Sequence, residues 1–310
     1  APARPRAMAA AAGGRRKSVG RGRKAEEPAI SKQALSRIER VVAYINAGEP
    51  VIQIFDLKIG DAGMQMLCEP LTRHLWVKEI HLPGNRIGDR GAISLANALA
   101  EKTNLSVLRL HENRIGPNGF GELAGSLVKH KGLQFLWMCN NSVGDEGVIR
   151  LSEALKENRG LEWLGLDANG ITDVGALSLG EVLATKSKLE WVGLDANNIS
   201  DEGACKLSSA LANHSGLQFL WLGGNRLGDE AAARLTEDLR KHEDFEFLGL
   251  EGNDDVGSDA VDALAEALPP KRGLEWMQLK HTIRGPDWRA PKRRDVDMLP
   301  LLLAERPSDW

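Results

Sequence analysis

Residues 161–171 read LEWLGLDANGI, and residues 189–199 repeat the pattern as LEWVGLDANNI. The asparagine of this pattern recurs every 28 residues, and apolar residues occupy the first, fourth and sixth positions of every copy. Seven copies in one phase indicate a chain built by stacking a single structural unit. The seven asparagines are Asn85, Asn113, Asn141, Asn169, Asn197, Asn225 and Asn253.

Each unit predicts a short strand, a tight turn and a helix. Alternate residues of a strand point to opposite faces, so Leu164 and Leu166 should point inward, while Trp163, Gly165 and Asp167 point outward. The asparagine is expected to turn inward and to satisfy backbone groups that the turn leaves unpaired. In five copies an aspartate before the helix should act as its N-cap, with Ser258 in the equivalent place of the seventh copy. These aspartates are Asp89, Asp145, Asp173, Asp201 and Asp229.

The pattern resembles the ribonuclease-inhibitor-like leucine-rich repeats, a group that includes the repeat regions of NOD-like receptors and the Ran GTPase-activating proteins. The resemblance covers residues 51–281. It implies an α/β fold, a horseshoe-shaped leucine-rich-repeat solenoid of 28-residue repeats with a parallel inner sheet and outer helices.

The ends of the chain depart from the repeat. Residues 30–50 are expected to form a capping helix, with an apolar stripe of Leu35, Ile38, Val42 and Ile45. A shortened first repeat should place Ile52, Phe55 and Leu57 at strand positions. Four regions follow from this organisation: a basic arm (1–29), a capping helix (30–50), the solenoid (51–281) and a C-terminal cap or tail (282–310).

Charge is distributed unevenly. Residues 1–24 hold eight basic residues and no acidic one, which leaves 32 basic and 43 acidic residues in 25–310, a net charge of −11. The arm has little apolar content besides alanine and is expected to be disordered by itself. Residues 4–24 could contact nucleic acid or another acidic partner, form a transit peptide, or be a solvated tail. Ser18 follows three basic residues and is a possible phosphorylation site.

The outward side chains of successive strands form columns that suggest a binding surface. Six consecutive aromatic residues occupy one column, and a large exposed apolar patch typically marks a binding site. Trp137 and Trp221 stand in the next column with glycines between them, which predicts a notch between two indole walls. Acidic side chains lie beside the notch. The candidate partner-binding residues are Phe135, Trp137, Trp163, Trp191, Phe219, Trp221, Phe247, Trp276, Asp167, Asp195 and Glu251.

Aromatic rings beside carboxylates favour a cationic ligand. We therefore expect a non-catalytic protein-interaction scaffold or adaptor that binds an apolar protein segment carrying a basic residue. Two alternatives stay open. One is a structural subunit of a large assembly, anchored by the basic arm. The other is a GTPase activator of the Ran type, with Arg86, Arg109 and Arg114 as candidate residues.

No phosphate-binding loop, metal-ligand spacing or catalytic constellation occurs, so neither an enzyme nor a cofactor is expected. A pairing of Cys139 with His111 is conceivable but lacks a third, orienting group. The three scattered cysteines suggest a reducing, cytoplasmic location, or an organelle matrix or stroma if residues 1–29 derive from a transit peptide. No apolar run approaches the ~20 residues of a membrane span.

Overall fold

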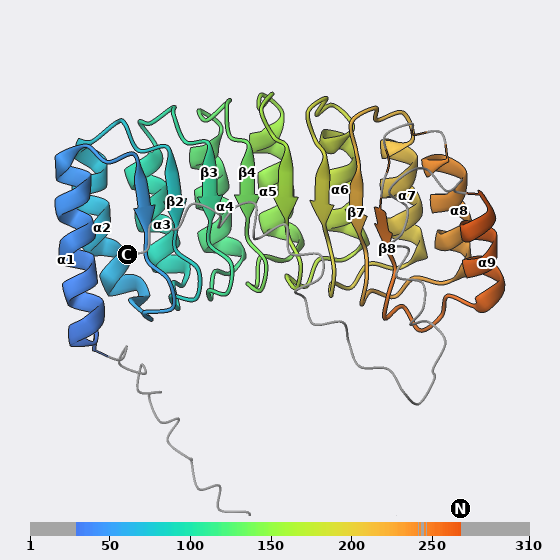
Figure 1. Ribbon diagram of the computed structural model, residues 1–310, viewed down its shortest axis with the longest axis horizontal. Coiled ribbons are helices and arrows are strands. Elements are labelled where there is room, and N and C mark those ends of the chain that lie inside the picture. Colours follow the sequence, from blue (N-terminus) through green and yellow to red (C-terminus); the bar gives the residue numbers. More distant parts are fainter. Residues whose placement is uncertain (1–28, 241, 243–244, 246, 268–310) are drawn as a thin grey trace, which may run out of the picture.

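The computed structural model describes residues 29–240, 242, 245 and 247–267, which form an open solenoid of alternating strands and helices. The eight strands in this part of the chain are parallel and follow one another in the order β1 to β8. Figure 1 shows the strands as one layer, with the helices covering one side of it. The expected leucine-rich-repeat solenoid is therefore confirmed.

Each repeat contributes a three-residue strand and one helix. The strands are β1 (Val51–Gln53), β2 (Glu79–His81), β3 (Val107–Arg109), β4 (Phe135–Trp137), β5 (Trp163–Gly165), β6 (Trp191–Gly193), β7 (Phe219–Trp221) and β8 (Phe247–Gly249). The helices are α1 (Lys32–Ala47), α2 (Gly60–Arg73), α3 (Asp89–Leu99), α4 (Pro117–Leu127), α5 (Gly144–Leu155), α6 (Asp173–Leu183), α7 (Asp201–Leu211), α8 (Asp229–Leu239) and α9 (Ser258–Ala267).

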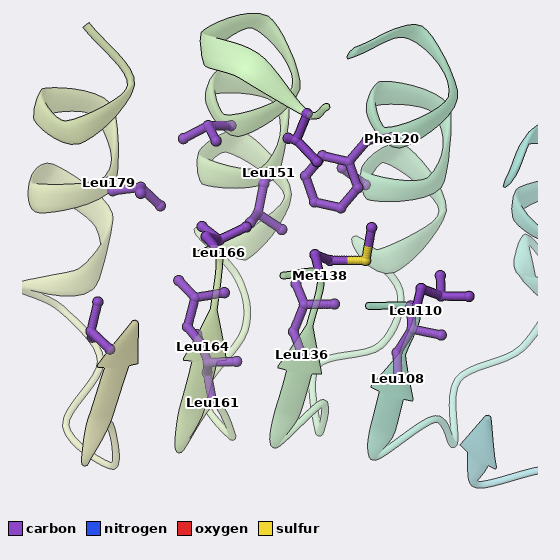
Figure 2. Packing of buried hydrophobic residues seen from close by; sticks show 14 of the residues in the cluster. Leu108, Leu110, Phe120, Leu136, Met138, Leu151, Leu161, Leu164, Leu166 and Leu179 are labelled. Carbon is purple, nitrogen blue, oxygen red and sulfur yellow. The ribbon is translucent and has the colours of Figure 1, made fainter. Parts of the chain in front are cut away.

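Residues that pair on neighbouring strands are separated in sequence by one repeat length. Trp163 of β5 pairs with Trp191 of β6, and Leu164 pairs with Val192, each 28 residues further along the chain. Leu164 and Leu166 are fully buried, as the alternation predicts. Figure 2 shows such leucines in the space between the strands and the helices, where Leu151 and Leu179 meet them. Equivalent side chains therefore form continuous columns from one repeat to the next.

The repeated asparagines form the expected ladder. The Nδ2 of Asn169 donates to the carbonyls of Leu166 in its own repeat and Met138 in the preceding repeat, at 3.1 and 3.0 Å. Its Oδ1 accepts the backbone N–H of Val143 at 3.2 Å. The same pattern recurs around Asn113 and Asn197. Because these backbone groups are buried, each asparagine satisfies polar atoms that would otherwise lack partners.

The aspartates do not cap their own helices, so that prediction is wrong. Asp173 is the first residue of α6, and Thr172 is the N-cap. The carboxylate of Asp173 instead accepts the backbone N–H and the hydroxyl of Ser200, at the start of the next helix, at 2.7 and 2.6 Å. Ser258 is likewise the first residue of α9. The equivalent bonds join Asp61 to Gly88, Asp89 to Gly116, Asp145 to Thr172, Asp201 to Gly228 and Asp229 to Gly257.

A second polar ladder, which was not predicted from the sequence, lies at the other ends of the helices. The Nζ of Lys186 donates to the carbonyls of Leu155 and Asn158 at 2.6 and 2.7 Å. Nε2 of His214 is 2.7 Å from the carbonyl of Lys186. These side chains satisfy the free carbonyls at the end of the preceding helix. The ladder consists of polar residues 28 positions apart: Lys102, His130, Asn158, Lys186, His214 and His242.

The first repeat differs from expectation. β1 pairs with β2 at the regular offset of 28 residues, so the repeat is not shortened. Ile52 and Ile54 point inward and are buried, whereas Phe55 is 40% exposed. In α1 the buried stripe is Ala34, Ile38, Val41 and Ile45, one residue earlier than expected at two positions. Both errors have the same cause. Where two apolar residues are adjacent in sequence, the pattern does not show which of them points inward, and the prediction took the wrong one.

Candidate functional site

The side of the sheet opposite the helices, called here the sheet face, carries three columns of side chains. They come from the first and third residues of each strand and from the second residue after it. The first column contains Glu79, Val107, Phe135, Trp163, Trp191, Phe219 and Phe247. The second contains His81, Arg109, Trp137, Gly165, Gly193, Trp221 and Gly249. The third contains Pro83, His111, Cys139, Asp167, Asp195, Gly223 and Glu251.

Six aromatic rings on β4 to β8 contact one another. Trp191 lies at the centre, with ring centroids 4.8 Å from Trp137, 6.1 Å from Trp163 and 6.5 Å from Trp221. Trp191 is 8% exposed, so the other rings cover it. Trp137, Trp163 and Trp221 remain half-buried. We call Phe135, Trp137, Trp163, Trp191, Trp221 and Phe247 the aromatic cluster.

The predicted notch between Trp137 and Trp221 is not open. A Cβ placed on Gly165 would lie 3.1 Å from the indole of Trp137. A Cβ placed on Gly193 would lie 2.3 Å from the indole of Trp191. The indoles therefore lie over the glycines instead of standing as walls beside them. The glycines are needed for close packing of the rings.

Substituting Gly193 by alanine tests this packing. The new methyl group would overlap the indole of Trp191, which contacts three other rings, so the ring must move. We expect a loss of about 1–3 kcal/mol in the free energy of unfolding and a weaker near-UV circular dichroism signal from the tryptophans. Gly125→Ala is the control, because a Cβ there meets nothing within 4 Å on α4. It should stabilise the helix by about 0.5–1 kcal/mol. Wild-type stability and spectrum in Gly193→Ala would contradict the described packing.

Two of the three candidate acids have structural partners. Oδ1 of Asp167 accepts the backbone N–H of Asp195 at 2.8 Å, and its Oδ2 accepts the thiol of Cys139 at 2.8 Å. Asp195 accepts the backbone N–H of Gly223 at 2.7 Å. Burial and the neighbouring Asp167 carboxylate raise the pKa of the Cys139 thiol well above its usual value. That protonated thiol lacks the thiolate character that a nucleophile needs.

The third acid, Glu251, has a buried polar atom without a hydrogen-bond partner, and so has its neighbour Trp221. The atoms are Oε2 of Glu251 and Nε1 of Trp221. Burial raises the pKa of the Glu251 carboxyl. A Cβ on Gly249 would lie 3.1 Å from Trp221, 3.1 Å from Phe247 and 3.2 Å from Oε2 of Glu251, so the three side chains converge above this glycine.

The N-terminal part of the sheet face has a different character. Nε2 of His81 lies 2.9 Å from a carboxylate oxygen of Glu79, and this hydrogen bond lowers the pKa of Glu79. Arg109 is half-buried on the neighbouring strand. Burial, and then the charge of Arg109, lowers the pKa of His111 to about 4. A mixed group of basic, neutral and acidic side chains therefore occupies β2 and β3, whereas the acids Asp167, Asp195 and Glu251 follow β5, β6 and β8.

The three arginines considered for GTPase activation do not form one group on the sheet face. Arg109 belongs to the second column, whereas Arg86 and Arg114 are exposed residues that follow Asn85 and Asn113 in the turns. Trp276, Ser18, the basic residues of 4–24 and the segment 282–310 lie outside the described residues. Within the described ranges, no group of three or more His, Cys, Asp or Glu side chains could hold a metal ion. No helix in those ranges is both long and apolar enough to cross a membrane.

Comparisons with known proteins agree with the repeat fold. A sequence model of the leucine-rich-repeat family matches residues 74–96. No curated protein matches the chain. The C-terminal domain of tropomodulin from Caenorhabditis elegans is similar at 17% identity and a TM-score of 0.40, over 57% of this chain and 92% of that one.

Two further solved structures are similar at the level of fold. Actin-binding site 2 of leiomodin-1 shares 22% identity at a TM-score of 0.36, over 43% of this chain and 77% of that one. Pollen receptor kinase 3 shares 20% identity at a TM-score of 0.38, over 59% of this chain and 76% of that one.

Proposed function

We propose that this leucine-rich-repeat protein is a non-catalytic scaffold or adaptor that binds a polypeptide segment on its sheet face, centred on the aromatic cluster. The observation that carries the proposal is the cluster itself. Six rings from five strands lie on the side of the sheet that none of the described helices covers, and several remain half-buried. Aromatic side chains of this kind contribute most of the binding free energy at many protein interfaces.

The chemistry of the face favours an apolar segment with at least one basic residue. The rings supply apolar area and π-faces, to which a lysine or arginine is attracted. Glu251 adds a carboxylate with an unpartnered oxygen at the C-terminal end of the cluster. An ion pair formed there would be partly shielded from water, which makes it stronger than an exposed pair.

The spacing of the repeat supports a ribonuclease-inhibitor-like subclass. Each 28-residue unit contains a helix of ten or more residues on the outer side of the sheet. The described cysteines Cys68, Cys139 and Cys205 are all free thiols. Free cysteines are typical of proteins in reducing compartments, and we place this protein in one of them.

Site-specific photo-crosslinking tests where the partner binds. In one variant benzoylphenylalanine replaces Phe219, which lies on the sheet face. In the control variant it replaces Leu177, which lies on the exposed side of α6. After irradiation in extract of cells that make the protein, we expect adducts with another polypeptide from position 219 and not from position 177. The same adducts from both positions, or none from position 219, would contradict the proposal.

A further inference from the structure

We propose that residues 298–303 of this chain bind the aromatic cluster of the same molecule and compete there with the partner. These residues, called here the tail segment, are Met298, Leu299, Pro300, Leu301, Leu302 and Leu303. The inference rests on the proposed function, because it concerns the same binding surface. It adds an internal ligand that limits access to that surface.

The tail segment has the chemistry that the sheet face favours. It consists of six apolar residues, and the basic run Lys292–Arg294 precedes it by four positions. The proposed partner is likewise an apolar segment with a basic residue. The basic arm lacks this combination, because its only apolar residues besides alanine, glycine and proline are Met8 and Val19. Since apolar side chains are needed to remove the exposed parts of the rings from water, the tail segment suits the aromatic cluster better than the arm does.

Net charge also favours contact between the C-terminal segment and the solenoid. Residues 268–310 contain nine basic and six acidic residues, which leaves 23 basic and 37 acidic residues in 25–267, a net charge of −14. The strands that carry Trp163 and Trp191 are each flanked by two half-buried acids. A basic run that approaches these strands therefore meets carboxylates on both sides of the rings. The flanking acids are Glu162, Asp167, Glu190 and Asp195.

The connection to the solenoid is long enough for the tail segment to reach the cluster. α9 ends at Ala267, so 30 residues separate it from the tail segment. In sheet order β5 and β6 lie two or three strands from β8, ~10–14 Å at the usual strand spacing. α9 lies behind the sheet (Figure 1), about 10 Å further at the usual separation of packed layers. A flexible chain of this length spans ~30 Å on average, so it need not be stretched.

Tethering makes even a weak contact effective. A linker of this kind gives an effective concentration on the order of 1 mM. A tail segment with a dissociation constant of about 100 µM would then occupy the sheet face about ten times as often as it leaves the face free. It would weaken the binding of an external ligand about tenfold. Partners that bind more tightly than the tail segment displace it, which gives the face selectivity for such partners.

Photo-crosslinking in the purified protein tests the contact. Benzoylphenylalanine replaces Phe219, and equal amounts of isotopically light and heavy protein are mixed before irradiation. We expect a crosslinked peptide that contains residues 298–303 and in which both halves carry the same isotope, because the contact forms within one molecule. The control variant carries benzoylphenylalanine at Leu177, on the exposed side of α6, and should give no such adduct.

Substitutions in the tail segment test the competition. The ligand is a labelled synthetic peptide of residues 292–304, and fluorescence anisotropy measures its affinity for the full chain. Leu301→Asp combined with Leu302→Asp places charges against apolar rings and should free the face, so this variant binds the peptide about tenfold more tightly than the wild type does. Pro307→Asp combined with Ser308→Asp is the matched control, because it adds the same charge outside the tail segment and should keep wild-type affinity.

The outcomes separate the two proposals. Adducts that join light and heavy protein, adducts with the basic arm, or no adduct with residues 298–303 would each overturn the inference. Equal affinity of the peptide for all three proteins would overturn it as well. The adducts with another polypeptide that form in cell extract decide the proposed function independently. That function stands if these adducts form at position 219 while the tail segment does not crosslink.

Discussion

Replacing Asn169 by alanine is expected to lower the free energy of unfolding by about 3 kcal/mol. The side chain bonds the carbonyls of Met138 and Leu166 and the N–H of Val143. Alanine leaves these buried groups without partners, and each unsatisfied group costs about 1–3 kcal/mol. The costs do not add fully, because the turn can relax and admit water. Urea unfolding followed by circular dichroism measures the change.

Asn118→Ala is the matched control for this experiment. Asn118 is exposed near the start of α4, and its substitution should change the free energy of unfolding by less than about 0.5 kcal/mol. A similar, small change in both variants would mean that the asparagine ladder contributes little to stability. The stacking of apolar columns would then be the main source of stability in the repeat.

The regular part of the fold follows directly from the sequence. Seven asparagines in one phase predict the parallel sheet, its register and the inward leucines, because a repeat of fixed length places equivalent residues side by side. The ladder of asparagines was predictable for the same reason. The second ladder, which includes Lys186 and His214, also has a period of 28 residues. It was missed because lysine, histidine and asparagine alternate in it, although all of them can donate to a helix-terminal carbonyl.

Side-chain direction was not predictable in the same way. Asp173 can reach the start of its own helix or that of the next repeat, and spacing alone does not decide between them. Likewise, the columns on the sheet face were predicted, but not the rotamers that place Trp137 over Gly165. That choice depends on contacts between strands, chiefly the stacking of Trp137 on Trp191. Whether the candidate residues bind a partner stays a prediction.

Trp163 is expected to be the most important single residue for partner binding. It lies between Phe135 and Trp191 in the first column, with ring centroids 5.7 and 6.1 Å away. Unlike Trp191, it remains half-buried and can still cover a ligand. Removing a central aromatic anchor typically costs at least about 2 kcal/mol of binding free energy, or roughly 30-fold in affinity. Trp163→Phe should retain most of the affinity, since it keeps the stacked ring.

Trp76→Ala provides the control, because Trp76 is 40% exposed but precedes β2 and contacts the ring of His74 in a tilted arrangement, away from the aromatic cluster. The measurement is the affinity of each folded variant for the polypeptide that crosslinks at position 219. We predict a loss of about 30-fold or more for Trp163→Ala and no change for Trp76→Ala. Wild-type affinity in Trp163→Ala, or an equal loss in both variants, would show that the aromatic cluster is not the binding surface.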